Sequence, residues 1–367
     1  MANIEGTLSM TDGEAGARDA LNAHVREIVA WHFSPDTGTP FWLDWAQEAG
    51  VAPASQVQSF ADLALLPRFE DEWLRYEPHD RWVPRAYLGR PFKIFETGGT
   101  TGMPKQRISW EDHLIDYSDF SGLLDRDYPD AFPHGANWLM LGPTGPRRLR
   151  LAIEHLANER GGSCYFVDLD PRWVKKAIAD QGAAIARQYM DHVIDQAVEL
   201  LKHRDVGCLF ATPRLLEALG ERIDVSHAGI RGVFCGGTSM TPQVIRFLIE
   251  EILEHRAALV PTYGNTLMGL AVAKPVSAED GFALTYYAPQ PRAVLRVVNP
   301  DVPGDEVGYD EWGRVELTTL TKEFFMPRFL ERDEAIRRRP CPRFVWDGVG
   351  EVRPFRSTEK KTVEGVY

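Results

Sequence analysis

Apolar positions follow three patterns along the 367-residue chain, and the first is helical. Leu21, Val25, Ile28 and Val29 recur at the spacing of one helix face, which predicts a helix over residues 19–33. Short helical segments separated by prolines continue to about residue 90. The polar, small residues up to about position 17 predict a mobile tail before the helix.

The second pattern alternates short apolar runs with helical segments. The predicted strands cover residues 137–141, 164–167, 206–211, 232–235 and 257–260. The predicted helices cover residues 149–160, 171–204 and 241–255, with another that opens at Pro213. Such alternation predicts βαβ units and a parallel sheet, whose ligand-binding loops gather at one edge.

The third pattern begins after Thr266, where helical spacing stops. Alternating or β-branched segments predict strands at residues 267–274, 284–287, 293–299, 313–319 and 344–352. The predicted fold class is therefore α/β with a β-rich subdomain. We place a helical cap at residues 1–90, an α/β core at 91–266, the β-rich subdomain at 267–356 and a polar tail at 357–367.

Composition narrows the class of protein. The net charge of −12 argues against nucleic acid as a partner. Four cysteines without a C-x-x-C pair fit a reducing cytoplasm and no metal site built on cysteine. We see no signal peptide and no apolar run long enough to span a membrane, so we expect a cytoplasmic protein.

A glycine-rich stretch between residues 95 and 105 is the first candidate site. Its loop residues are Thr97, Gly98, Gly99, Thr100, Thr101 and Gly102, and Pro104 and Lys105 follow. Glycine lets the backbone N–H groups approach a phosphate closely, and the hydroxyls and the ammonium add donors. A flexible surface turn is the alternative. The order of residues differs from the nucleotide P-loop, because Lys105 is followed by Gln106.

Four further stretches stand at predicted turns or strand ends. They contain Gly142, Thr144 and Gly145; Gly236, Gly237, Thr238 and Ser239; Tyr263, Gly264, Asn265 and Thr266; and Arg328, Phe329 and Asp333. Each has an ordinary alternative, either a turn after a strand or, around Asp333, a solvated charged run on a helix or loop. Asp310 and Asp347 are weaker competitors of Asp333.

Residues 97–105 match at every position the phosphate loop of the adenylate-forming superfamily, and the other stretches follow in the expected order. The chain resembles the branch of phenylacetate–CoA ligases, and most closely its short members in phenazine antibiotic biosynthesis. The resemblance implies the large, N-terminal domain of the superfamily and ATP-dependent adenylation of an aromatic acid, with AMP as the product-side ligand. In this resemblance, Lys105 and the loop bind the β- and γ-phosphates, Thr266 binds the α-phosphate, Tyr263 stacks on the adenine and Asp333 binds the ribose. The resemblance also implies Mg²⁺ as a cofactor that neutralises the remaining phosphate charge. It places residues 142–145, Gly236, Ser239, Tyr263 and Gly264 near the acid.

The sequence departs from the family at two places. Leu267 stands where the family has the glutamate that helps to hold Mg²⁺, and a leucine cannot bind a hard cation. The small C-terminal domain with its adenylation lysine is not recognisable after residue 353. We therefore keep two alternatives, a non-catalytic binding protein for nucleotide and aryl acid, and a half-enzyme completed by a separate small-domain protein. The acyl acceptor and a homodimer are left open.

Overall fold

The computed structural model describes residues 2–98, 103–145 and 148–355. Its helices are α1 (Ala2–His32), α2 (Pro40–Ala49), α3 (Pro53–Gln56), α4 (Trp73–Tyr76), α5 (Asp112–Asp127), α6 (Arg148–Glu159), α7 (Pro171–Gln181), α8 (Ala183–His203), α9 (Pro213–Gly220) and α10 (Pro242–Phe247). Short helical turns are η1 (Ala61–Leu65), η2 (His79–Trp82), η3 (Arg85–Tyr87), η4 (Leu248–Ile252) and η5 (Ala278–Asp280). A small hairpin pairs β1 (Lys93–Glu96) with β2 (Gln106–Ser109).

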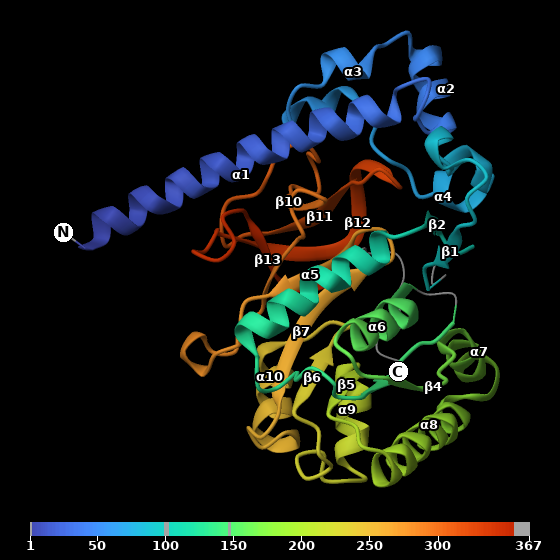
Figure 1. The fold of residues 1–367 in the computed structure, drawn as a ribbon, viewed down its shortest axis with the longest axis vertical. Coiled ribbons are helices and arrows are strands. Elements are labelled where there is room, and N and C mark those ends of the chain that lie inside the picture. Colours follow the sequence, from blue (N-terminus) through green and yellow to red (C-terminus); the bar gives the residue numbers. More distant parts are fainter. Residues whose placement is uncertain (1, 99–102, 146–147, 356–367) are drawn as a thin grey trace.

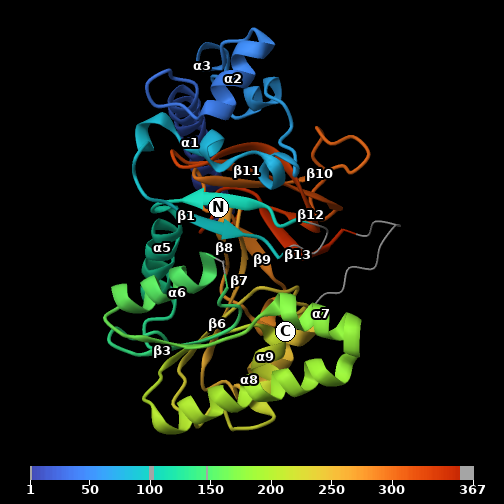
Figure 2. The ribbon, with the colours of Figure 1, turned by 90° about the vertical axis from the view of Figure 1, so that its right-hand side faces the viewer.

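The remaining described strands form one 11-stranded sheet. They are β3 (Trp138–Leu141), β4 (Cys164–Val167), β5 (Cys208–Ala211), β6 (Gly232–Cys235), β7 (Ala258–Asn265), β8 (Gly269–Ala273), β9 (Thr285–Tyr287), β10 (Ala293–Val298), β11 (Trp312–Leu320), β12 (Phe325–Arg338) and β13 (Gly348–Pro354). Their order is β10-β11-β12-β13-β9-β8-β7-β6-β5-β3-β4. The parallel part lies at one end of the molecule and the antiparallel part lies under the N-terminal helices at the other (Figures 1 and 2).

Strand β7 joins the two parts of the sheet. Its first half pairs in parallel with β6, with Phe234 opposite Val260. Its second half pairs antiparallel with β8, with Tyr263 opposite Ala271. The predicted domain boundary at residue 266 thus falls just after a strand that belongs to both halves. Residues 261–265, expected in a turn after the strand, continue it instead.

Alternate residues of the parallel strands enter two separate cores, as strand geometry requires. Trp138, Met140, Phe210 and Phe234 pack with α5 and α6 on one face. Leu139, Leu209 and Val233 belong to the core on the opposite face. Helices α5 and α6 lie side by side (Figure 1), so the aromatic residues of β5 and β6 face them.

Two expectations about elements are wrong, and so is one of the alternatives. Helix α1 begins at Ala2, so a helix replaces the predicted mobile tail. The predicted helix over residues 171–204 is two helices, because Gly182 takes a φ of 84° between them. The charged run around Asp333 is neither helix nor loop but the middle of β12, where Glu331 and Glu334 are buried strand residues.

The N-terminal cap packs on the antiparallel sheet through aromatic rings. Trp42 is fully buried, lies 5.2 Å from Phe325 between ring centroids and donates its indole N–H to the Phe325 carbonyl. In the described part of the chain, no helix is both long and apolar enough to cross a membrane.

Candidate active site

Two adjoining pockets open at the carboxyl ends of β5, β6 and β7. The larger one, called the large pocket, has a volume of about 250 Å³. It is lined by Thr97, Gly98, Tyr117, Pro143, Arg148, Leu149, Phe210, Thr212, Phe234, Gly236, Gly237, Thr262, Gly264, Asn265, Thr266, Gly269 and Leu270. An apolar cavity of roughly 150 Å³ accommodates benzene. The large pocket therefore has room for more than a single aromatic ring.

The second cavity, called the small pocket, has a volume of about 170 Å³. It is lined by Gly237, Thr238, Ser239, Met240, Thr262, Tyr263, Gly264, Asn265, Tyr286, Asp333, Val352 and Arg353. Gly237, Thr262, Gly264 and Asn265 line both cavities and so form the junction between them. A molecule that spans the junction would present one end to apolar rings and the other to hydroxyl and carboxylate groups.

Two polar pairs connect β7 with β12 beside the small pocket. The Tyr263 hydroxyl donates to Asp333 Oδ2 at 2.6 Å, and Asn265 Nδ2 donates to Glu331 Oε1 at 3.0 Å. Residues two apart on a strand point to the same face, so both pairs lie on one side of the sheet. Burial, with the charges of Asp333 and Glu331, raises the pKa of Tyr263, which keeps the hydroxyl a donor.

Asp333 differs in position from Asp310 and Asp347, the weaker candidates for the same role. Asp333 lines the small pocket. Asp310 is paired with Arg338 and Asp347 with Arg337, and neither lines either pocket of the candidate site. Of the three aspartates, only Asp333 is therefore placed to accept hydrogen bonds from a ligand in the small pocket.

The junction depends on a close approach between β6 and β7. A Cβ on Gly236 would lie 2.8 Å from Thr262 Oγ1, so the two strand ends can meet only with glycine there. Gly237 has a φ of 93°, in the left-handed region that favours glycine. The glycine pair predicted from the sequence thus shapes the narrow wall shared by both pockets.

The glycine-rich stretch is the turn of the β1–β2 hairpin. Thr97 N donates to the Lys105 carbonyl at 3.0 Å, and Lys105 N donates to Thr97 Oγ1 at 3.0 Å. Thr97 and Gly98 line the large pocket. Gly99, Thr100, Thr101 and Gly102, which the sequence predicts at the phosphates, lie outside the described residues.

Lys105 itself lines neither pocket. Its Nζ is 2.9 Å from Asp71 Oδ1 and 4.4 Å from the centre of the Phe329 ring, and the side chain is 4% exposed. Burial raises the pKa of Asp71, but Lys105 and Arg75 lower it by charge and hydrogen bonding, and the net shift is downward. The lysine predicted to bind phosphate is therefore held by an ionised carboxylate of the cap.

The predicted acid-binding turn is placed only partly at the large pocket. Pro143 lines it, whereas Gly142, Thr144 and Gly145 do not. Thr144 donates to Asp168 at 3.0 Å. A Cβ on Gly142 would lie 2.7 Å from the Phe210 ring, so this glycine makes room for an aromatic wall of the pocket.

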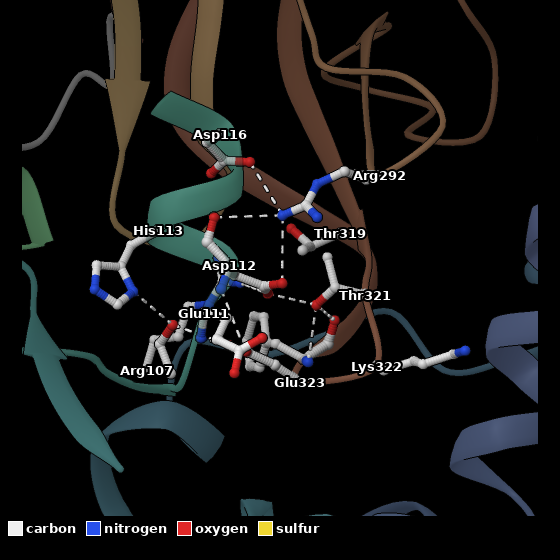
Figure 3. Close-up of polar contacts among 12 residues, drawn as sticks. Arg107, Glu111, Asp112, His113, Asp116, Arg292, Thr319, Thr321, Lys322 and Glu323 are labelled. Carbon is white, nitrogen blue, oxygen red and sulfur yellow. Dashed lines mark hydrogen bonds and ion pairs between the residues drawn. The ribbon is translucent and has the colours of Figure 1, made fainter. Parts of the chain in front are cut away.

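A buried charged network, which no sequence motif indicates, adjoins the large pocket through Arg148. Figure 3 shows the part of it around Asp112 and Asp116. Arg107 pairs with Asp112 at 2.5 Å, and Arg292 reaches Asp112 at 3.3 Å and Asp116 at 3.1 Å. Arg148 in turn donates to Asp116. Arg107, Asp112 and Asp116 are close in sequence, but Arg148 and Arg292 lie far from them. No sequence motif therefore points to the network.

Glu323 and His113 complete the network. Glu323 accepts the backbone N–H groups of Trp110 at 2.8 Å and Asp112 at 3.2 Å, at the N-terminus of α5, where a carboxylate is favourable. Burial, with the positive charge of Arg148, lowers the pKa of His113 to about 3. His113 is therefore neutral near pH 7.

Leu267 does not face a ligand site. Its side chain is 1% exposed, and its carbonyl accepts from Arg107 and from Thr319 Oγ1. The described residues contain no group of three or more histidine, cysteine, aspartate or glutamate side chains that could hold a metal ion. The described residues therefore do not form a magnesium site of their own.

The solved structures with this arrangement of elements include 2-hydroxyisobutyryl-CoA ligase. Its complex with 2-HIB-AMP and CoA superposes with a TM-score of 0.67 at 16% identity, over 94% of this chain and 69% of the ligase. An open conformation of the same ligase gives a TM-score of 0.64 at 15% identity, over 92% of this chain and 69% of the ligase. No protein-family model matches the sequence. The search of curated proteins likewise finds no match. The chain has the fold of the large domain of adenylate-forming enzymes, as the sequence predicts.

Proposed function

We propose that the protein activates an aromatic carboxylic acid with ATP, giving acyl-AMP and pyrophosphate. The observation that carries this proposal is the pair of adjoining pockets, one lined by aromatic and aliphatic side chains and the other by Tyr263 and Asp333. The acid would occupy the large pocket and the adenosine the small pocket. The carboxylate and the α-phosphate would then meet at the junction, near Thr266.

In the reaction, a carboxylate oxygen attacks the α-phosphorus and forms a C–O–P bond. The bond between the α-phosphorus and the bridging oxygen breaks, and pyrophosphate leaves with that electron pair. Two anions must approach, so hydrogen-bond donors and positive charge at the junction supply the main catalytic effect. We assign Thr266 to the α-phosphate, Asp333 to the ribose hydroxyls, and Tyr263 to the adenine. No step is assigned to Mg²⁺, because Leu267 removes the expected ligand.

Lys105 would bind the β- and γ-phosphates after it exchanges Asp71 for phosphate. The exchange keeps the ammonium paired with an anion, so the charge balance of its buried site is preserved. Within the aromatic acids, we propose a phenazine carboxylic acid. The sequence resemblance favours it, and the volume and aromatic lining of the large pocket are compatible with a fused ring system.

Acid-dependent exchange of radiolabel between pyrophosphate and ATP tests the proposal. We expect exchange with fused-ring aromatic acids, stronger than with acetate or another small aliphatic acid. Absence of exchange with every aryl acid, at high enzyme concentration, would contradict the enzymatic assignment.

A binding protein without catalysis is the second candidate. The Lys105–Asp71 pair favours it, because the lysine proposed to bind phosphate is already paired with a carboxylate. Calorimetry separates the two: a binding protein takes up AMP and aryl acid together but shows no exchange. Exchange that appears only when a separate small-domain protein is added would identify a half-enzyme.

A further inference from the structure

Among the described residues, one charged side chain stands in the wall of the large pocket. Arg148, at the start of α6, is only 6% exposed and lies among Tyr117, Leu149 and Leu270 in that wall. Its Nη2 donates to Asp116, but its buried Nε has no hydrogen-bond partner among the described residues. Buried N–H groups are nearly always paired in folded proteins. An unpaired guanidinium N–H in a ligand pocket therefore points to a partner on the ligand.

Arg148 shares its carboxylate partner with a second arginine. The partner is Asp116, and the second arginine is Arg292, whose Nη2 lies 3.1 Å from Asp116 Oδ1. A guanidinium group carries five N–H donors, so one shared carboxylate leaves donors for another acceptor.

Gly269 makes room in the pocket wall for the Arg148–Asp116 pair. Gly269 also lines the large pocket, and its φ is 113°. A Cβ at this position would lie 2.2 Å from Asp116 Oδ2 and 3.4 Å from Arg148 Nη1. The glycine thus leaves the space in which Asp116 holds the guanidinium at the pocket wall.

Arg148 is not one of the residues that form the junction, where the acid would react. The junction with the small pocket consists of Gly237, Thr262, Gly264 and Asn265, and Arg148 lines only the large pocket. An acid whose carboxylate reaches the junction directs the rest of its ring system into the cavity that Arg148 borders.

We propose that Arg148 is a specificity-determining residue, and that the acid carries on its ring system a hydrogen-bond acceptor, separate from the reacting carboxylate, which binds the Arg148 guanidinium. This inference rests on the proposed function, because it takes the large pocket to be the acid site. A carboxylate and a neutral carbonyl both supply the required acceptor, and the experiment distinguishes them.

The test compares naphthalene carboxylic acids that carry hydrogen, a carboxamide or a second carboxylate at each other ring position. Calorimetric affinities are measured with AMP present, for the wild type, Arg148→Met and Arg148→Lys. We expect the wild type to bind at least one acceptor-bearing acid about tenfold or more tightly than the plain acid. Arg148→Met should reduce the ratio of the two affinities, acceptor-bearing acid over plain acid, to near one. Its affinity for the plain acid should stay within about threefold of the wild-type value.

Arg148→Lys should keep part of the preference for the dicarboxylic acid and lose the preference for the amide. Arg150→Met is the matched control, because Arg150 lies on the same helix but is 40% exposed and pairs with Glu154. Each ratio is measured within one variant, so a general loss of stability does not imitate the result. If Arg148→Met does not fold, the wild-type ratio and Arg148→Lys decide the outcome.

An unchanged ratio in Arg148→Met, or a wild type that does not distinguish the acids, would overturn the inference. Failure of the proposed function looks different: pyrophosphate exchange would be absent with all acids, whereas the ratio of binding affinities would still report on Arg148.

Discussion

The large and small pockets use their polar groups in opposite ways. In the small pocket, Tyr263 and Asp333 already bind each other across two strands, so a ligand that forms hydrogen bonds there joins or replaces an existing pair. In the large pocket the walls are mainly apolar, and Arg148 presents an N–H that no described residue accepts. Exchange of existing hydrogen bonds suits a constant substrate such as a nucleotide. A single unsatisfied donor in an apolar cavity suits selection among similar acids, since it penalises those without an acceptor.

If this difference between the pockets holds, a change at the residues proposed to bind phosphate should abolish pyrophosphate exchange with every acid, whether or not the acid carries an acceptor for Arg148. Lys105→Ala removes the ammonium next to the glycine-rich turn. We expect pyrophosphate exchange to fall by about 100-fold or more, as for the loss of one preorganised group that stabilises transition-state charge. The measurement is the exchange rate at saturating acid, with circular dichroism to show that the variant folds.

Lys93→Ala is the control for this change, because Lys93 is exposed on β1 of the same hairpin. Unchanged exchange in Lys105→Ala would remove the lysine from the mechanism and would support the binding-protein alternative.

Asp333→Asn should affect only the small pocket. It replaces one of the two carboxylate oxygens expected to accept from the ribose, while the remaining carbonyl can still accept from Tyr263. A hydrogen bond to a charged group contributes about 1.5–3 kcal/mol, so the KM for ATP should rise by about 10- to 100-fold. Acid affinity, measured by calorimetry, should stay within about twofold.

Asp310→Asn provides the control, since it removes the same charge from a residue that pairs with Arg338 and lines neither pocket. An equal effect of Asp333→Asn on acid and ATP would show that the two pockets are not independent.

The difference between the pockets also explains what the sequence could predict. The glycine pair at 236–237 and the stretch around Tyr263 are local in sequence, because a strand end and its neighbours form one wall. The parallel strands were likewise visible as continuous apolar runs. The family resemblance predicts Asp333 as a site residue but not its strand, because the buried Glu331 and Glu334 interrupt the apolar–polar alternation of β12.

Arg148, Tyr117 and the charged network come from α5, α6, β2 and the turn before β10, and they meet only in the folded chain. These residues are functional candidates because they are buried, not because of their spacing in the sequence. The burial of a charged residue cannot be predicted from a single sequence. The same holds for Lys105, whose motif was recognised but whose partner Asp71 was not.

Acid pH should lower the free energy of unfolding through His113, which is buried in the charged network. Burial, with Arg148, lowers the pKa of His113 from 6.5 to about 3. Below pH 6.5 the unfolded chain binds a proton that the folded chain does not, so the free energy of unfolding falls as the pH falls. Between pH 6.5 and 5 this group should cost about 2 kcal/mol. Urea unfolding at several pH values measures the slope.

His113→Gln should remove about half of the total pH dependence of the free energy of unfolding between pH 6.5 and 5. The rest is expected to come from His32, which lies in the cap and whose pKa is lowered by burial to about 4. His32→Gln is therefore the matched variant, with a similar effect on stability but none on acid binding. A stability that is constant from pH 6.5 to 5 would contradict neutral, buried states for both histidines.

The smallest effect is expected where the cap and the phosphate lysine meet. In Asp71→Asn the side chain keeps its size and an acceptor oxygen, but Lys105 loses its anionic partner. If phosphate replaces Asp71 on Lys105, removal of this competitor should lower the Kd for ATP by about three- to tenfold, which corresponds to about 1 kcal/mol. Arg75 and Arg332 also contact Asp71, and Arg332 lies 3.6 Å away, so the loss of the carboxylate also raises the positive charge around the phosphate.

Asp44→Asn is the control for a charge change in the cap, because Asp44 is exposed and pairs with Arg81 at 3.4 Å. Isothermal titration with ATP at two salt concentrations distinguishes the local from the general effect, since exposed charges are screened and the buried pair is screened much less. Equal gains in both variants would mean that Asp71 acts only through net charge. A weaker affinity for ATP in Asp71→Asn would mean that Asp71 positions Lys105 for the nucleotide instead of competing with it.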